Sequence, residues 1–323
     1  MLFQNVAMHI PDGFLSITVS IIFWALSVGV IMVALSRANR ELGEREVPVM
    51  GVLAAAIFAG QMLNFSVTGG TSGHLLGAAL AAILLGPWAA VLVMTSVVSV
   101  QALIFQDGGL LVLGANLFNM AVIGPFVSYF TYRLFPWAAR GQRWGIFAGG
   151  FVAAWASIEV SALSVALQLS LSGTSPANSA FPTMGGIHAL IGIGEGLITM
   201  GALSFIYAAR RDLLKIGEPQ RSSTRVVLAG GLLLTLALAV LSPLASSNPD
   251  GLEWVAEQAG FLHTAQAPSY NLIPDYLFPG ISNAALATVV AGLLGGLIVL
   301  GVAFLVAYTR RHHDESTSEV SGD

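Results

Sequence analysis

The sequence predicts an all-α membrane protein, a polytopic bundle of transmembrane helices. Of its 323 residues, 55% are hydrophobic and only 9% are charged, and the mean hydropathy is +0.80. A soluble domain typically carries about 25% charged residues, so this chain has too little polar surface to cover a water-facing globule. The chain contains no cysteine, which excludes thiolate ligands and leaves nitrogen and oxygen atoms for any metal site.

Nine apolar stretches predict about nine membrane spans, since a helix needs roughly 20 residues to cross a bilayer. They cover residues 14–36, 47–63, 75–86, 87–105, 110–132, 145–171, 186–209, 226–244 and 281–308. The third and fourth stretches form one run that is too long for a single helix. We expect Gly86-Pro87 to divide it, because proline lacks a backbone donor and clashes with the preceding turn.

The basic residues predict the orientation of these spans. All thirteen fall in loops of one face in the nine-span arrangement: Arg37, Arg40, Arg45, Arg133, Arg140, Arg143, Arg210, Arg211, Lys215, Arg221, Arg225, Arg310 and Arg311. Loops rich in lysine and arginine remain on the cytoplasmic side. The N-terminus is therefore expected outside and the C-terminus in the cytoplasm, which requires an odd number of spans.

The polar segments predict how the chain is organised. Residues 8–211 contain seven spans, residues 212–224 form a polar cytoplasmic linker, and residues 225–323 contain two further spans. The last two spans are separated by an outer loop with no basic residue, over residues 245–280. Within it, Asn248-Pro249-Asp250 is typical of a helix start, where asparagine caps and aspartate favours the positive end of the helix.

Four of the six histidines are expected at the outer face or just within it: His9, His74, His188 and His263, while His312 and His313 lie in the cytoplasmic tail. Each alone is more often a polar residue satisfied between helices. Four on one face of so apolar a chain favour a functional site, because ionisable groups at membrane depth are costly. Imidazole is a good ligand for nickel, cobalt, copper and zinc.

Several motifs resemble the CbiM/NikM family, whose members are substrate-specific subunits of energy-coupling factor transporters for cobalt or nickel. The matching segments are MHIPDGFL at 8–15, GHLLG at 73–77, QALIFQDGG at 101–109, GAN at 114–116 and IGIGEG at 191–196. The stretch PDGLE at 249–253 resembles the accessory N component of such transporters. Its position between two spans, after a CbiM-like unit, indicates that this component is fused to the C-terminus.

The resemblance implies a metal-import function and its partners. A substrate-specific subunit would bind Ni²⁺ or Co²⁺ as cargo, with no resident cofactor and no nucleic acid. It would work with a coupling transmembrane (T) subunit and two cytoplasmic ATPase subunits, in the inner or cell membrane of a bacterium or archaeon. The sequence agrees that ATP hydrolysis belongs to other chains, because the only lysine, Lys215, follows a leucine and cannot belong to a phosphate-binding loop.

The resemblance also implies a metal site built from the N-terminus itself. Its ligands would be the amine of Met8, the amide nitrogen and imidazole of His9, and the imidazole of His74. Such nitrogen ligands suit the square-planar preference of Ni²⁺ or Cu²⁺ and favour nickel slightly over cobalt, although the choice stays open. Seven residues precede Met8 here and would leave it an amide in place of an amine. We therefore expect residues 1–7 to be a wrongly assigned or removed extension, and translation to begin at Met8.

Other polar residues are expected near this site. Asn64, Ser66 and Thr71 could orient the His74 ring or simply cap the loop. His188 and Glu195, two helical turns apart on one face, could line an ion path or bond to each other.

Two alternative functions remain open from the sequence. One is a metal channel or secondary carrier that works without a coupling ATPase. The other, which has less support, is an intramembrane enzyme using Glu159, Glu195 and His188.

Overall fold

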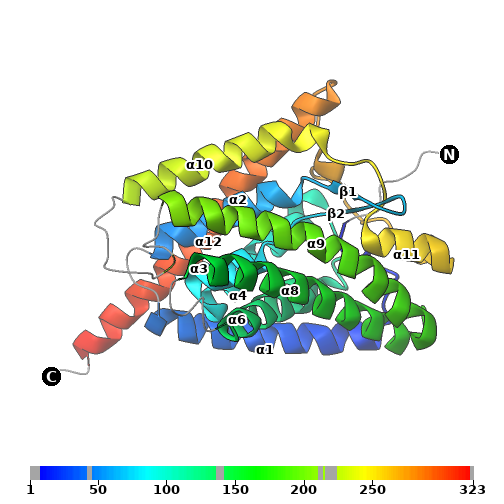
Figure 1. The fold of residues 1–323 in the computed structure, drawn as a ribbon, viewed down its shortest axis with the longest axis horizontal. Helices are drawn as coiled ribbons and strands as arrows, with labels where there is room; N and C mark the ends of the chain where they lie inside the picture. Colours follow the sequence, from blue (N-terminus) through cyan, green and yellow to red (C-terminus); the bar gives the residue numbers. More distant parts are fainter. Residues whose placement is uncertain (1–7, 42–45, 136–141, 210–213, 215–223, 321–323) are drawn as a thin grey trace.

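The structure, a computed structural model, describes residues 8–41, 46–135, 142–209, 214 and 224–320. Most of the chain forms helices that lie side by side in a bundle (Figure 1). The expected extension 1–7 and nearly all of the expected linker 212–224 lie outside the described residues, as do Arg45, Arg140 and four more of the basic residues.

The N-terminal unit contains helices, two short strands and two π-helical segments. Its elements are α1 (Ile17–Glu41), α2 (Glu46–Gln61), β1 (Phe65–Val67), β2 (Thr71–Gly73), α3 (Ala78–Leu85), α4 (Pro87–Val100), η1 (Gln101–Phe105), α5 (Leu113–Leu117), η2 (Phe118–Ile123), α6 (Gly124–Arg133), α8 (Arg143–Leu171) and α9 (Ala177–Ala209). The strands form an antiparallel hairpin with Ser66 opposite Ser72. Helices α8 and α9 form the most extensive helix pair of the bundle.

The C-terminal unit contributes two long helices and the loop between them. Its elements are α10 (Thr224–Leu241), η4 (Ser242–Leu244), α11 (Gly251–Ala259), η5 (Leu262–Thr264), η6 (Pro274–Tyr276) and α12 (Ala284–Val320). Both α10 and α12 pack against α2, and the intervening loop covers the hairpin end of the bundle. Ser72 donates its backbone N–H to the carbonyl of Pro249 at 2.8 Å, so the loop continues the hydrogen bonding of the hairpin.

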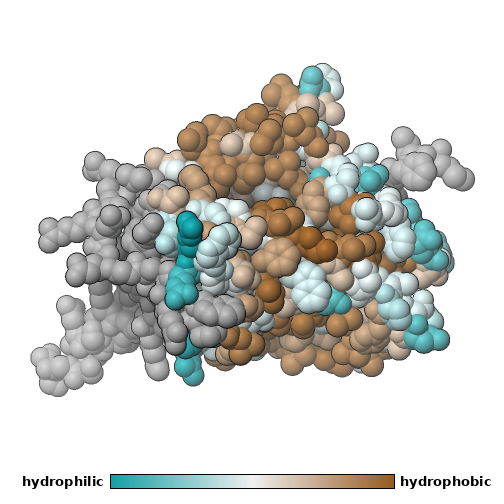
Figure 2. All heavy atoms as spheres, in the orientation of Figure 1, coloured by the Kyte–Doolittle hydropathy of each residue, from teal (hydrophilic) through white to brown (hydrophobic). Residues whose placement is uncertain are grey.

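The membrane class predicted from the sequence is confirmed. Among the described residues, six helices are long and apolar enough to cross a bilayer: Ile17–Ala38, Pro87–Phe105, Leu113–Arg133, Arg143–Leu171, Ala177–Ala208 and Ala284–Thr309. Two shorter apolar helices cover Val47–Gln61 and Leu228–Leu244. Figure 2 shows apolar side chains gathered across the middle of the visible face, with hydrophilic ones towards the hairpin end. The protein is a multi-pass helical membrane protein, and the nine-span count stays a prediction.

The third expected span is shorter than the sequence suggested. The break at Gly86-Pro87 is confirmed, with Gly86 in a left-handed conformation (φ 83°) and Pro87 opening α4. However, α3 has only eight residues, about 12 Å at 1.5 Å per residue, against a hydrocarbon core of about 30 Å. Residues 71–77 instead form β2 and an extended turn, which ends at Gly77 with a positive φ of 77°.

The π-helical segment η1 explains how the C-terminal loop attaches to the bundle. Backbone carbonyl groups in a π-helical segment are less well hydrogen-bonded within the helix than those of an α-helix. Such segments are frequent at functional sites. The Tyr270 hydroxyl donates to the Leu103 carbonyl at 2.9 Å, and the Ile273 N–H donates to the Ile104 carbonyl at 3.1 Å. The loop therefore satisfies backbone groups of the N-terminal unit immediately before residues 106–109.

Candidate metal centre

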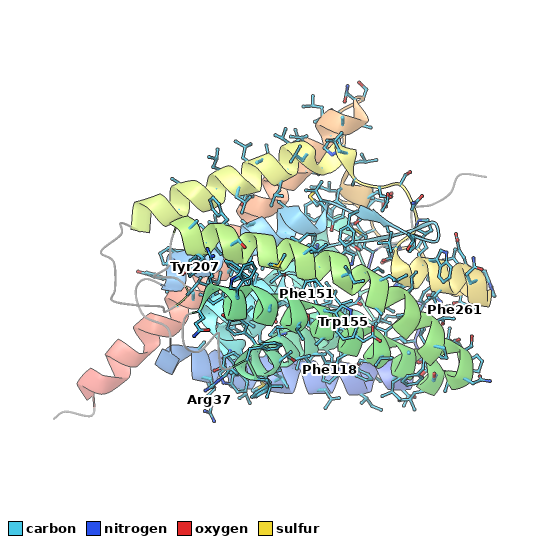
Figure 3. The ribbon with its side chains drawn as sticks, in the orientation of Figure 1. Arg37, Phe118, Phe151, Trp155, Tyr207 and Phe261 are labelled. Atoms are coloured by element: carbon cyan, nitrogen blue, oxygen red, sulfur yellow. The ribbon has the colours of Figure 1, made fainter. Side chains whose placement is uncertain are left out.

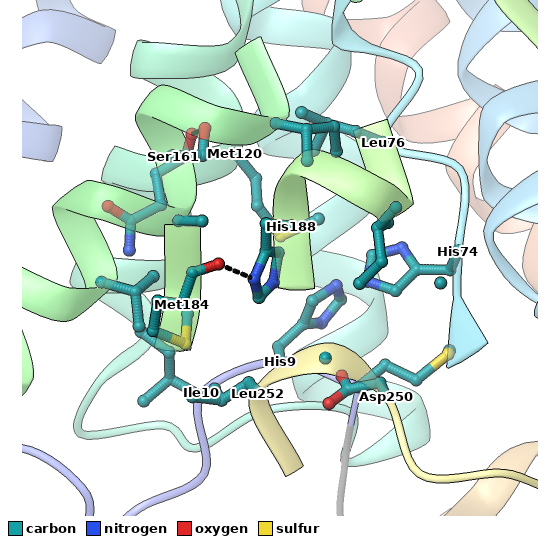
Figure 4. Close-up of a pocket in the computed structure, with 18 of the residues that line it drawn as sticks. His9, Ile10, His74, Leu76, Met120, Ser161, Met184, His188, Asp250 and Leu252 are labelled. Carbon is teal, nitrogen blue, oxygen red and sulfur yellow. Dashed lines mark hydrogen bonds between the residues drawn. The ribbon is translucent and has the colours of Figure 1, made fainter. Parts of the chain in front are cut away.

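A cavity of about 100 Å³ lies beneath the hairpin end of the bundle. Its walls come from the N-terminal segment 8–10, residues 73–76, the stretch around η2, and the facing sides of α8 and α9. Asp250, Gly251 and Leu252 of the C-terminal unit form a further wall, on the side of His9 (Figure 4). The cavity therefore lies where the two units meet.

His9 reaches this cavity from the N-terminal segment. Its side chain is buried, and its Nδ1 donates to the Asp107 carbonyl at 3.1 Å while lying 3.3 Å from the Asp107 Oδ1 atom. The other ring nitrogen, Nε2, is buried without a hydrogen-bond partner among the described residues. A buried polar atom left without a partner is costly and calls for a ligand or water.

The residues that follow His9 explain why the MHIPDG segment is held so firmly. Asn116 pairs with both backbone groups of Ile10: Oδ1 accepts from the N–H and Nδ2 donates to the carbonyl, each at 3.1 Å. The Asp12 carboxylate accepts from the N–H groups of three consecutive residues, Leu110–Val112. Gly13 has a φ of 94°, and a Cβ there would collide with the Thr264 carbonyl. The segment is thus fixed at the cavity by backbone-directed contacts.

His74 faces His9 across the cavity. The two ring centroids are 5.7 Å apart with their planes nearly perpendicular (Figure 4). The His74 Nδ1 donates to the Leu75 carbonyl at 3.0 Å. Burial and the neighbouring His9 lower the pKa of His74, which keeps its imidazole in the neutral form that binds metals.

Glu195 on α9 holds the chain just after His74. Its two carboxylate oxygens accept from the N–H groups of Leu76 and Gly77 at 2.8 and 3.0 Å. Its side chain is fully buried. The carboxylate therefore fixes the extended turn that carries His74, which ends at Gly77, the residue before α3.

His188 contributes a third imidazole to the cavity wall. Its Nδ1 donates to the Met184 carbonyl at 2.8 Å, one helical turn earlier on α9 (Figure 4). Its opposite edge faces Gly251, where a Cβ would lie 3.0 Å from Nε2. His188 and Glu195 therefore both lie near the cavity end of α9, but their hydrogen bonds go to different backbone groups.

Asn64, Ser66 and Thr71 lie on and beside the hairpin and make their hydrogen bonds to the C-terminal loop. The Asn64 carbonyl accepts from the Ser246 N–H, and the Ser66 hydroxyl donates to the Ser246 hydroxyl at 3.0 Å. The Thr71 hydroxyl donates to the Pro249 carbonyl at 3.0 Å. These contacts join the two units over the cavity.

Asp107, Asn116, Asp250 and Tyr276 are site residues to which the sequence analysis assigned no ligand or supporting role. Asp107 and Asn116 lie in the QALIFQDGG and GAN segments, so the motif match was a usable signal for both. Burial in the wall of the cavity raises the pKa of the Asp250 carboxyl group to about 8. For Tyr276 the sequence carries no signal, since its importance depends on a contact across 169 positions of the chain.

The described residues contain no group of three or more His, Asp or Glu side chains close enough to hold an ion by themselves. The cavity instead offers imidazoles from three separate segments, those of His9, His74 and His188, and the backbone nitrogens beside His9.

The fold and this cavity define a multi-pass membrane protein with a nitrogen-rich site at one end. The family model for the cobalt uptake substrate-specific transmembrane region, CbiM, matches residues 9–213, and that for the PDGLE domain matches residues 225–312. This chain belongs to the CbiM family of cobalt and nickel transport proteins, and carries a PDGLE domain fused to its C-terminus.

Relatives share this fused arrangement. The chain is 32% identical to the fused nickel transport protein NikMN of Rhodobacter capsulatus, covering 94% of this chain and 99% of that one. It is 38% identical to a candidate fused nickel transport protein NikMN of Archaeoglobus fulgidus, with the same coverage. A crystal structure of a truncated transition metal transporter has a TM-score of 0.54 and 36% identity, covering 62% of this chain and 99% of that one. The family consists of transporters, so the protein is not an enzyme.

Proposed function

We propose that this protein is the substrate-binding membrane component of an ATP-driven energy-coupling factor transporter that imports Ni²⁺ or Co²⁺. The observation that carries the proposal is the juxtaposition of the His9 and His74 rings, whose centroids lie 5.7 Å apart at the wall of a cavity. ATP hydrolysis would come from two separate ATPase subunits acting through a coupling transmembrane subunit. The membrane would be the inner or cell membrane of a bacterium or archaeon.

The ligand set we propose is the Met8 amine, the His9 amide nitrogen and imidazole, and the His74 imidazole. Met8, His9 and His74 all line the cavity, which supports this set. The backbone amide nitrogen and the imidazole of one histidine can chelate the same ion only through Nδ1, because Nε2 is on the far side of the ring from the backbone. In the structure Nδ1 rests on Asp107, so the ring must turn about its Cβ–Cγ bond when the ion binds. The Met8 amine is available only if Met8 is amino-terminal in the working protein.

The nine-span arrangement gives the transport direction, with the cavity outside. Figure 3 places Arg37, at the end of α1, at the opposite end of the bundle from Phe261 in the loop over the cavity. This separation supports the positive-inside orientation, in which basic residues are cytoplasmic. We propose that residues 8–211 bind the ion, that residues 225–323 cover the site, and that residues 212–224 join the two on the cytoplasmic side.

Calorimetry with Ni²⁺ tests the proposed site. His74→Ala removes one of four ligands, so we expect Ni²⁺ binding to fall by at least roughly 100-fold, beyond the 10- to 100-fold typical of losing only a supporting contact. The matched control is His263→Ala, which changes an exposed histidine of the outer loop and should leave binding unchanged. Equal affinity in wild type and His74→Ala would remove His74 from the site. Uptake in cells lacking coupling ATPases would instead favour a channel or secondary carrier.

A further inference from the structure

Asp107 connects a proposed metal ligand with the C-terminal unit. One side of Asp107 faces the His9 ring, with Oδ1 3.3 Å from Nδ1. On the other side, Oδ2 accepts a hydrogen bond of 2.6 Å from the Tyr276 hydroxyl. Both Asp107 and Tyr276 are buried, at 3% and 8% exposure. Tyr276, in the covering loop (residues 245–280), therefore contacts the residue on which the His9 ring rests.

Tyr276 is the side-chain hydrogen-bond donor of Asp107 among the described residues. The Oδ1 atom is buried without a hydrogen bond, and the His9 N–H is directed at the Asp107 backbone carbonyl. Burial and the nearby Asp107 raise the pKa of Tyr276 well above its usual value, so the phenol keeps the proton that it donates. Without this bond, the carboxylate would be buried with no donor of its own.

The backbone around Tyr276 shows that this contact is specifically built. Asp275 and Tyr276 have φ values of 53° and 56°, in the left-handed region that non-glycine residues seldom adopt. Such conformations are strained and persist only where surrounding contacts hold them. Here the Tyr276 ring stacks on Phe105, with centroids 4.8 Å apart, and its hydroxyl reaches Asp107.

We propose that Tyr276 is a positioning residue that links closure of the C-terminal loop to metal capture by His9. The inference rests on the proposed ligand set, in which Nδ1 leaves Asp107 to bind the ion. When the His9 ring turns to bind the ion, its N–H moves away from Asp107. The Tyr276 hydroxyl is then the donor on which the Asp107 carboxylate depends. Opening the loop then costs more than in the metal-free protein, because it would leave a buried carboxylate without a donor. By reciprocity, a closed loop favours the metal-bound ring.

Tyr276→Phe tests this linkage because it removes one hydroxyl and keeps the ring that stacks on Phe105. We expect Ni²⁺ affinity of the full chain to fall by roughly tenfold or more, since the bound state then contains an unsatisfied carboxylate. The matched control is Tyr270→Phe, which removes a hydroxyl of the same loop that donates only to the carbonyls of Ala102 and Leu103. That variant should bind Ni²⁺ like the wild type.

Hydrogen exchange gives a second readout that a purely structural role would not produce. Added Ni²⁺ should increase amide protection over residues 266–280 in the wild type and in Tyr270→Phe, and should leave it unchanged in Tyr276→Phe. Equal affinities for the two tyrosine variants, or a Ni²⁺ response that persists in Tyr276→Phe, would overturn the linkage. His9→Ala tests the ligand set separately from the role of Tyr276. If that variant still binds Ni²⁺, the proposed ligand set is wrong, and the linkage through Tyr276 fails with it.

Discussion

His9 and His74 face the same cavity, but different parts of the molecule hold them. The turn carrying His74 is fixed by Glu195, from within the helix α9 of the same unit. The His9 ring rests on Asp107, whose carboxylate is shared with Tyr276 of the C-terminal unit. The turn of one candidate ligand is therefore clamped within a single unit. The other candidate, His9, has its backbone fixed by Asn116 and Asp12, but its ring rests on a residue shared with the C-terminal unit. This difference suggests that His74 is a fixed half of the site and His9 the half that responds to closure.

Glu195→Gln should have the largest effect on the His74 half. The two N–H groups of Leu76 and Gly77 bind different oxygens of the Glu195 carboxylate, so glutamine would present its NH2 group, a donor, to one of them. We expect a loss of about 1–3 kcal/mol in unfolding free energy and a roughly 10- to 100-fold loss of Ni²⁺ affinity. Thermal unfolding and calorimetry measure the two effects.

The control for that variant is Glu159→Gln. Glu159 lies on the neighbouring helix α8, and its Oε2 is buried without a hydrogen-bond partner among the described residues. This substitution should leave Ni²⁺ affinity unchanged. If Glu195→Gln binds Ni²⁺ as tightly as Glu159→Gln does, the hydrogen bonds from the turn to Glu195 are not needed to position His74.

Asn116→Ala should have an intermediate effect on the His9 half. It removes both hydrogen bonds to Ile10, but Asp12 still fixes the segment through three backbone N–H groups. We expect a roughly three- to tenfold loss of Ni²⁺ affinity, corresponding to one or two hydrogen bonds. Thr174→Val serves as control, because Thr174 bonds the same segment further along, at the Phe14 carbonyl. A loss as large as that of Glu195→Gln would show that the two halves are equally rigid.

Gly251→Ala should have the smallest effect and sharpens the role of the covering loop. The added Cβ would lie 2.6 Å from Ile191 and 2.9 Å from His188, so the loop must shift away from α9. Because the loop can move outward, we expect only part of the overpacking strain to reach the site, with affinity changing by about threefold or less. Faster hydrogen exchange around residue 251, compared with Gly201→Ala at an open position, would confirm the shift. Unchanged exchange would show that the loop does not depend on this contact.

The amino-acid sequence by itself determined the class of the protein. Its composition and long apolar runs require a bilayer environment, and Gly86-Pro87 breaks a helix through local sterics that neighbouring residues suffice to predict. The motif residues His9 and His74 were candidate ligands from the sequence, and the structure places both at one cavity. These inferences succeed because composition, backbone chemistry and short motifs act over a few residues.

Only the tertiary structure decided what holds the candidate ligands. Glu195 meets Leu76 across 119 positions and Tyr276 meets Asp107 across 169, and no periodic pattern encodes which side chains will meet between packed helices. The start of α3 is an example: the apolar run from Leu75 predicts a helix, but residues 74–77 form an extended turn in which the N–H groups of Leu76 and Gly77 bind Glu195. A buried carboxylate needs hydrogen-bond donors. Only the packing of α9 against this turn brings the Glu195 carboxylate within reach of these two N–H groups, so the local sequence cannot predict the contact.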